Sequence, residues 1–170
     1  MAEVRITRWS SAGLELLRQL NTHEVRQHTG GPETDEQVVA RHGRYLAGPG
    51  PRSGHMYTVA LPDGETVGSV GYWAREWRGE QVYEMGWAIL PAYQGRGLAT
   101  AAVRAVIAEA GADGDRRSAH AYPSVDNPAS NAVCRKAGFT LLGETEFEYG
   151  PGQMMRSNDW RIDLTGQTEQ

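Results

Sequence analysis

Hydrophobic residues recur along the chain at two spacings, which predict an alternation of strands and helices. Leu14, Leu17 and Leu20 fall on one face of a helix that Ser10 or Ser11 caps and that ends before residues 29–32. Alternating or short apolar runs predict strands over residues 4–9, 56–61, 66–72, 81–90, 118–122, 140–149 and 160–164. With further helices expected after residues 34, 97 and 127, the order is strand, two helices, three strands, helix, strand, helix and two strands.

Turn and capping residues mark the ends of several elements. Thr34 followed by Gln37 has the pattern of a capping box, which predicts that the second helix starts there and continues through Leu46. The Asp-Gly pair within residues 62–65 predicts a hairpin turn between two strands. Residues 48–54 have the glycine and proline content of a loop.

An anion site is predicted where an apolar strand runs through a glycine loop into an Ala-rich helix. Gly95 and Gly97 let the backbone approach a ligand closely, and the first N–H groups of a helix favour negative charge. A phosphorylated ligand is therefore expected at residues 95–100. No lysine directly follows either glycine, as a P-loop requires, and the segment reads G-x-G-x-x-T instead of the dinucleotide pattern G-x-G-x-x-G/A.

Two motifs narrow the choice of phosphorylated ligand. Residues 94–99 read Q-x-x-G-x-A, and residues 127–139 read N-x-x-S-x-x-V-x-x-K-x-G-F. Asn127 before Pro128 suits a helix N-cap, and Gly138 suits the left-handed position just past a helix end. Together the motifs resemble the two conserved blocks of the GNAT superfamily of acetyl-CoA-dependent N-acetyltransferases. They most resemble the branch that includes the ribosomal-protein N-terminal acetyltransferases. The resemblance is close over residues 80–140 and elsewhere extends only to element order.

The resemblance implies an α/β fold in which helices cover both faces of a strongly bent mixed sheet, splayed between its fourth and fifth strands. It implies acetyl-CoA as co-substrate, with the pantetheine arm in the splay and the pyrophosphate at the glycine loop. The residues implied to bind the cofactor are Trp87, Ala88, Ile89, Gly95, Arg96, Gly97, Leu98, Ala99, Thr100 and Asn127. Asn127 could equally serve only as a helix cap, and Arg96 could equally be a solvated surface residue without a role in binding.

Acetyl transfer to an amine needs a base, and the resemblance implies a carboxylate on the fourth strand. Glu84 is the residue at that position, and strand alternation places its side chain on the same face as Gly86 and Ala88. Partial burial would raise its pKa toward neutrality, which suits a general base. An ion-paired structural glutamate is the alternative. An oxyanion donor is expected from the strand backbone near Ile89.

The departing thiolate needs a proton, and here the chain departs from the commonest family pattern. Cys134 stands where many GNAT enzymes carry tyrosine. The resemblance to the ribosomal-protein branch favours Ser130 as the acid, with Cys134, Tyr122 or water left open. A covalent role for Cys134 is disfavoured, because no histidine partner accompanies this single cysteine.

The acceptor is expected near the segment that joins the first two helices, residues 23–36. This segment holds four carboxylates against Arg26, so it could attract a protonated amine, although a solvated loop is an equal alternative. Its acidic residues are Glu24, Glu33, Asp35 and Glu36. Trp73, Trp77 and Trp87 are expected mainly in the core, with a wall of the acceptor pocket as the alternative.

Composition suits one globular domain over residues 1–170, which the resemblance implies is an acetyltransferase domain. Hydrophobic residues make up 39% of the chain and the formal net charge is −4, so neither a membrane span nor a nucleic-acid surface is expected. The first residues lack a signal-peptide apolar region and there is a single cysteine, which together favour the cytoplasm. No metal is expected, because the five histidines form no ligand spacing and His23 and His28 are one residue too far apart for H-E-x-x-H. A homodimer is compatible with the sequence.

Two functions follow from these observations. The first is transfer of an acetyl group from acetyl-CoA to a primary amine, on a small molecule or a protein N-terminus, by direct attack on the thioester. The alternative is an acyl-CoA-binding sensor or structural module of the same fold without turnover.

Overall fold

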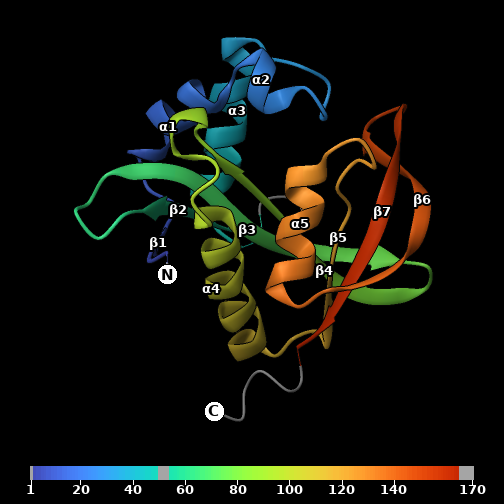
Figure 1. Ribbon diagram of the computed structural model, residues 1–170. Helices are drawn as coiled ribbons and strands as arrows, with labels where there is room; N and C mark the ends of the chain where they lie inside the picture. Colours follow the sequence, from blue (N-terminus) through green and yellow to red (C-terminus); the bar gives the residue numbers. More distant parts are fainter. Residues whose placement is uncertain (1, 50–53, 165–170) are drawn as a thin grey trace.

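The computed structural model describes residues 2–49 and 54–164, so part of the predicted loop at residues 48–54 lies outside the described residues (Figure 1). The elements are β1 (Arg5–Arg8), α1 (Gly13–Leu20), α2 (His23–Arg26), α3 (Asp35–Leu46), β2 (His55–Ala60), β3 (Thr66–Trp77), β4 (Glu80–Ile89), the 3-10 turn η1 (Pro91–Tyr93), α4 (Leu98–Asp113), β5 (Ser118–Ala121), α5 (Pro128–Ala137), β6 (Thr140–Gly150) and β7 (Gln153–Asp163). Within these residues, no helix combines the length and apolar character needed to cross a bilayer.

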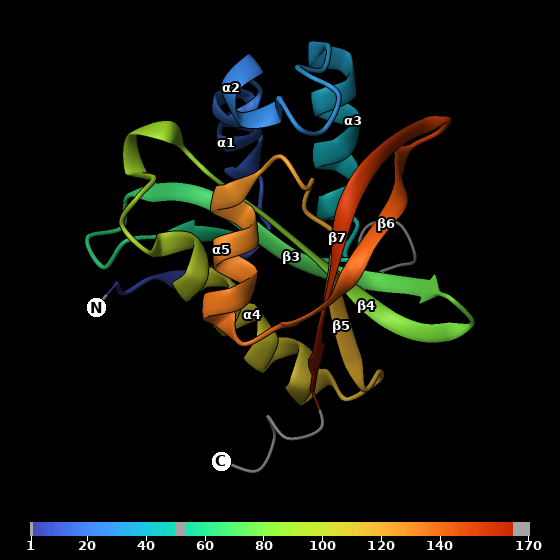
Figure 2. The ribbon, with the colours of Figure 1, turned by 45° about the vertical axis from the view of Figure 1, so that its right-hand side comes forward.

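The strands form one seven-stranded mixed sheet in the order β1-β2-β3-β4-β5-β7-β6 (Figures 1 and 2). All neighbours are antiparallel except β4 and β5, which run parallel. These two strands pair only at Tyr83 with Ala119 and at Glu84 with His120. Beyond Glu84 they part, so the predicted splay between the fourth and fifth strands is confirmed.

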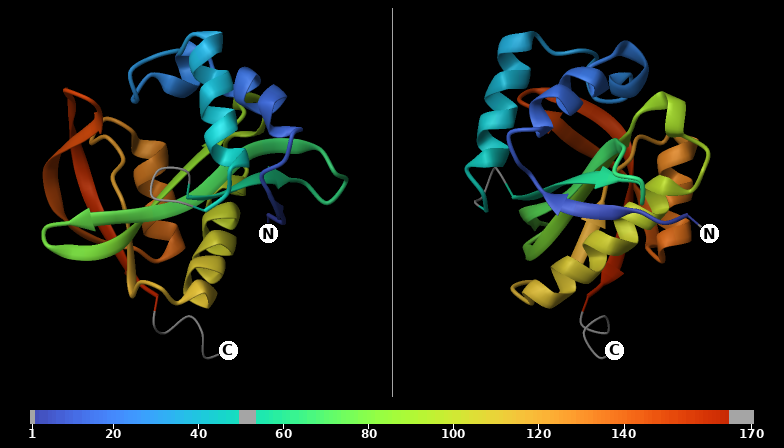
Figure 3. Two further views of the ribbon diagram at one scale, coloured as in Figure 1. Left: turned by 180° about the vertical axis from the view of Figure 1, so that it is seen from behind. Right: turned by 90° about the vertical axis from the view of Figure 1, so that its left-hand side faces the viewer.

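Helices cover both faces of the sheet, as predicted (Figure 3). On one face, α1 and α3 enclose a small core built around Trp9, Leu17 and Val38. On the other, α4 and α5 pack against the central strands over the larger core, which is rich in valine and alanine. Val103 and Val106 of α4 are fully buried in this core, which anchors the helix against the sheet.

The first predicted helix is wrong in two respects. Its cap is neither Ser10 nor Ser11: the helix begins after Ala12 with no side-chain cap, and the Trp9 ring lies directly over Gly13. It is also two helices, because Asn21 leaves the helical path and exchanges hydrogen bonds with the Glu33 backbone, 2.8 Å in each direction. A separate short helix, α2, then begins with its own cap.

Other local signals are confirmed. Thr34 and Gln37 form the capping box, with hydrogen bonds in both directions. Gly138 ends α5 with a φ of 103°, in the left-handed region that glycine tolerates. Two strands extend further than predicted, β3 to Trp77 and β7 back to Gln153. Pairing with the partner strand of a long hairpin keeps these added residues extended, although their sequence shows no clear alternation of apolar and polar residues.

Candidate active site

Two adjoining cavities occupy the splay and together form one cleft. The first, called here the glycine-loop cavity, has a volume of about 740 Å³ and lies against the start of α4. The second, the hairpin cavity, has a volume of about 560 Å³ and lies between β4 and the β6–β7 hairpin. Eight residues line both cavities, so a ligand in one can reach a ligand in the other: Arg26, Thr29, Arg41, Tyr45, Trp73, Gly86, Trp87 and Ser130.

The far half of β4 forms the floor of the cleft. Trp87, Ala88 and Ile89 line the glycine-loop cavity, beyond the last residue of β4 that pairs with β5. Within the described residues no strand pairs with β4 on that side, so its backbone groups are available to an extended ligand. An extended chain adds to such an edge through main-chain hydrogen bonds.

The glycine loop has the geometry of an anion site. Gly95 and Gly97 have φ values of 78° and 77°, and Gly97 is the N-cap of α4. Helix geometry leaves the first N–H groups of α4 without intrahelical acceptors, and they lie at the positive end of the helix dipole. The Gln94 side chain donates to the Ile89 carbonyl over 3.0 Å, which ties the loop to the end of β4.

Most residues predicted to bind the cofactor come together around this cavity. Those that line it are Trp87, Ala88, Ile89, Gly95, Gly97, Leu98, Ala99, Thr100 and Asn127. Arg96 does not: its guanidinium lies over the Tyr93 ring, 5.2 Å from the centroid, and donates to the Ala92 carbonyl over 3.4 Å.

Asn127 and Ser130 meet at the N-terminus of α5. The Asn127 side chain accepts from the Ser130 backbone N–H over 3.2 Å, as the predicted N-cap. The amide group of Asn127 also donates to Ser130 Oγ over 3.2 Å. The hydroxyl oxygen is therefore held at the junction of the two cavities, and its O–H proton is free to point into the cleft.

Glu84 lines the hairpin cavity at the vertex of the splay. Its side chain is 14% exposed, and Arg75 Nη1 donates to Glu84 Oε1 over 2.9 Å. Burial raises the pKa of the Glu84 carboxyl above its usual range; the Arg75 guanidinium opposes this shift but does not cancel it. The carboxylate can thus accept a proton closer to neutrality than an exposed glutamate can.

The other proton donors considered from the sequence lie in different environments. Cys134 is fully buried in the core, and burial raises the pKa of its thiol to about 12, so it is an inert packed side chain. Tyr122 lines the hairpin cavity but not the glycine-loop cavity, and burial raises the pKa of its phenol. Its hydroxyl is buried without a hydrogen-bond partner among the described residues.

The three tryptophans divide between cleft and core. Trp73 and Trp87 line both cavities, so they are not confined to the core. Trp77 packs on Tyr122, 4.8 Å between ring centroids, and its indole donates to Asp159 over 3.0 Å.

The negative charge expected on residues 23–36 is partly balanced by arginines outside this segment. Glu33 forms ion pairs with Arg41 and Arg26, at 2.6 and 3.9 Å, and the exposed Asp35 pairs with Arg18. Sequence reasoning missed Arg41 because it lies on the next helix, outside the segment considered. Its spacing of four residues from Tyr45 predicts a shared helix face but not that this face lines the cleft.

A further cluster adjoins Glu84 beneath the cleft. His120 and Asp159 are each 2% exposed, and their Nδ1 and Oδ1 atoms are 2.6 Å apart. Among the described residues, no three His, Cys, Asp or Glu side chains gather as metal ligands.

A splayed mixed sheet with a helix N-terminus and glycine loop at its opening offers an anion site beside a free strand edge, which suits a phosphorylated ligand with an extended arm. The chain belongs to the GNAT acetyltransferase family: the model of the acetyltransferase (GNAT) domain matches residues 3–140. The family predicted from the two motifs is therefore confirmed. No curated protein sequence matches the chain.

Solved structures share the fold over nearly the whole chain. The aminoglycoside acetyltransferase AAC(6')-Ib in complex with coenzyme A has a TM-score of 0.80 and 20% identity, covering 99% of this chain and 100% of that chain. The Salmonella typhimurium acetyltransferase that modifies the N-terminal serine of ribosomal protein L7/L12 has a TM-score of 0.73 and 21% identity, covering 94% of each chain. Spermidine N-acetyltransferase from Vibrio cholerae, in complex with CoA and spermine, has a TM-score of 0.77 and 13% identity, covering 96% and 97%.

Proposed function

We propose that the protein transfers the acetyl group of acetyl-CoA to a primary amine, with Glu84 as the general base. The observation that carries this proposal is the continuous cleft that leads from the glycine loop, through the splay, to a partly buried carboxylate with a raised pKa. One end of the cleft suits a phosphorylated carrier, the middle suits its extended arm, and the far end supplies a base.

The cofactor would occupy the glycine-loop cavity. Its pyrophosphate would accept from the N–H groups of residues 95–100, where the two left-handed glycines remove steric obstruction. The pantetheine arm would lie between the far half of β4 and α5, with Asn127 on the second wall. Arg96 lies outside this arrangement and would contribute only at long range.

The acceptor would enter through the hairpin cavity as an ammonium ion. Glu84 takes one proton from it, directly or through water, and the neutral amine nitrogen attacks the thioester carbonyl carbon. A C–N bond forms, the C–S bond breaks, and the nitrogen loses its second proton. The products are the N-acetylated amine and CoA, with one net proton released. A backbone N–H near Ile89 would stabilise the oxyanion.

Ser130 is the proposed source of the proton for the thiolate. It lies at the junction of the two cavities, where the sulfur of the carrier would meet the acceptor, and Asn127 fixes its oxygen. Cys134 is buried away from the cleft, and Tyr122 lines only the acceptor end. A hydroxyl is a weak acid, so Ser130 would relay a proton while the sulfur charge develops.

The nature of the acceptor is proposed only as far as a primary amine, on a small molecule or at a protein N-terminus. Similar structures include enzymes whose named ligands or substrates are kanamycin, spermine and a ribosomal protein N-terminus, and what these share is an amine. We place this chemistry in a single domain over residues 1–170, supported by the one sheet that spans β1 to β7. A cytoplasmic location is in keeping with the free thiol of Cys134.

The test is release of CoA thiol from acetyl-CoA, measured with a panel of small amines and N-terminal peptides, with acetylated product identified by mass spectrometry. We expect amine-dependent thiol release and a mass gain of one acetyl group on the acceptor. Tight acetyl-CoA binding with no amine-dependent release across the panel would favour the sensor or structural module instead.

A further inference from the structure

The hairpin cavity is lined by three guanidinium groups and three carboxylates: Arg26, Arg41, Arg75, Glu33, Glu84 and Glu148. Two of the guanidinium groups are neutralised at close range. Arg75 holds Glu84 at 2.9 Å, and Arg41 holds Glu33 with Nη2 at 2.6 Å and Nε at 3.1 Å. The remaining cation and anion, Arg26 and Glu148, form no ion pair with each other among the described residues.

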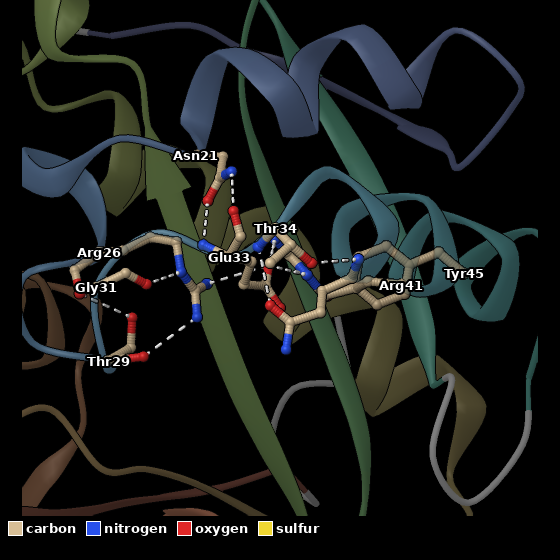
Figure 4. Close-up of polar contacts among 9 residues, drawn as sticks. Asn21, Arg26, Thr29, Gly31, Glu33, Thr34, Arg41 and Tyr45 are labelled. Carbon is tan, nitrogen blue, oxygen red and sulfur yellow. Dashed lines mark hydrogen bonds and ion pairs between the residues drawn. The ribbon is translucent and has the colours of Figure 1, made fainter.

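Arg26 is fixed mainly by neutral groups (Figure 4). Its Nε donates to the Gly31 carbonyl over 2.9 Å, and its Nη2 donates to the Thr29 carbonyl over 3.1 Å. Its Nη1 comes no closer than 3.9 Å to Glu33, and it approaches the same oxygen, Oε1, that Arg41 already holds. One carboxylate therefore serves two guanidinium groups, and Arg26 has the weaker share.

The environment of Arg26 disfavours its charge. The side chain is only 23% exposed. Burial lowers the pKa of the guanidinium, and Arg41 adds to this effect, while Glu33 opposes it incompletely. An anionic group placed against Nη1 would relieve this imbalance, and a planar carboxylate matches the hydrogen-bonding geometry of a guanidinium.

Glu148 supplies the opposite charge across the cavity, on the β6–β7 hairpin. Its carboxylate accepts from the Gly152 backbone N–H over 3.1 Å, which holds it at the hairpin turn. A ligand with one positive and one negative group would thus find an incompletely compensated cation in Arg26, and carboxylates at Glu84 and Glu148 that can receive its ammonium group. A polyamine has no negative group, so it would leave the charge of Arg26 uncompensated.

Resting on the acetyl-transfer function proposed above, we propose that the acceptor is an amino acid or a closely related amino carboxylate. Its carboxylate binds Arg26, and its amine lies toward Glu84. The loop carbonyls of residues 29 and 31 orient the guanidinium before the ligand arrives, so little side-chain entropy is lost on binding. The role of the Arg41–Glu33 pair is to hold the neighbouring wall of the cavity.

The experiment measures binding of the reaction products, so it does not depend on turnover. N-acetyl amino acids and their matched N-acetyl amino acid amides are titrated by calorimetry into protein saturated with CoA. We expect at least one N-acetyl amino acid to bind roughly 10- to 100-fold more tightly than its amide, the range for a hydrogen bond to a charged group. Arg26→Gln should abolish this preference.

Two further variants separate recognition from support of the loop. Arg26→Lys keeps the charge but loses the paired carbonyl contacts, and it should retain part of the preference for the free carboxylate. Arg18→Gln removes an exposed arginine that pairs with Asp35 outside the cavity, and it should change nothing. Equal binding of acids and amides by the wild-type protein, or no binding by any acid, would overturn the assignment. A clear preference for acids without any acetyl transfer would instead overturn the proposed function and leave the Arg26 site standing.

Discussion

Glu84 of β4 and His120 of β5 are partners in the last register pair that joins these two strands. Neighbouring residues in a parallel pair present their side chains to the same face, so the carboxylate and the imidazole lie side by side at the vertex of the splay. His120 is anchored below by Asp159. The position of the proposed base is therefore set by the point at which the sheet opens.

The His120–Asp159 pair should contribute strongly to stability. Asp159→Asn should lower the free energy of unfolding by about 3 kcal/mol, because it removes one partner of a buried, hydrogen-bonded pair. Chemical denaturation at pH 7 measures the change. Glu144→Gln, which breaks an exposed pair with Arg156, is the control and should cost no more than about 1 kcal/mol. A loss as small as that of the control would contradict the structural role of the pair.

The same pair predicts a dependence of stability on pH. Burial alone would raise the pKa of Asp159, but the hydrogen bonds from His120 and Trp77 outweigh it and hold this pKa below the ordinary 3.8. A carboxyl with a depressed folded-state pKa stabilises the fold above its unfolded-state pKa and loses that contribution as the pH falls through the folded value. The difference between wild type and Asp159→Asn should therefore be full above pH 3.8 and shrink below it.

The start of α4 should be the anion site. Ala99→Glu places a carboxylate in the first turn, against the glycine-loop cavity, and should weaken CoA binding roughly tenfold or more through charge repulsion and lost space. Ala108→Glu adds the same side chain to the exposed face of the same helix and should leave CoA affinity unchanged. Isothermal titration with CoA makes the comparison. Equal affinities for both variants would remove the pyrophosphate from this helix end.

Ser130 and Cys134 lie on the same helix, but substitutions at the two positions should have different effects on turnover. Ser130→Ala should lower kcat by about 10²-fold if its hydroxyl supplies the proton for the thiolate. Cys134→Ala should keep kcat close to that of wild type, and iodoacetamide should alkylate the thiol only after unfolding, because it is fully buried. Full turnover by Ser130→Ala would assign the proton to water or another group.

The motif-bearing half of the fold is readable from the sequence for identifiable physical reasons. Glycine and asparagine are strongly favoured at helix caps. Gly97, Asn127 and Gly138 therefore mark helix boundaries at the positions where the structure has them. The capping box at Thr34 is equally local. By contrast, α1 and α2 read as one helix, because their separation depends on Asn21 bonding to the backbone of Glu33, twelve residues away.

The lining of the hairpin cavity could not be predicted in the same way. Arg26, Arg41 and Arg75 come from three elements, and nothing in their local sequence indicates that they face one cavity. The local count of charges on residues 23–36 overstated the negative charge, since the balancing arginines Arg18 and Arg41 lie outside that segment. Long-range ion pairing of this kind follows from topology, which residue spacing alone does not encode.

The most direct test of the central claim is the pH dependence of kcat/KM for wild type and Glu84→Gln with the best acceptor. In wild type, kcat/KM should rise with pH through an apparent pKa above 4.5, as the buried Glu84 loses its proton. In Glu84→Gln, kcat should fall by about 10²- to 10³-fold near pH 7 with acetyl-CoA affinity almost unchanged. The rise of kcat/KM with pH that Glu84 causes should be absent from this variant. Glu80→Gln, on the same strand but outside the cavities, should match wild type. Normal turnover and an unaltered pH profile in Glu84→Gln would contradict the proposed mechanism.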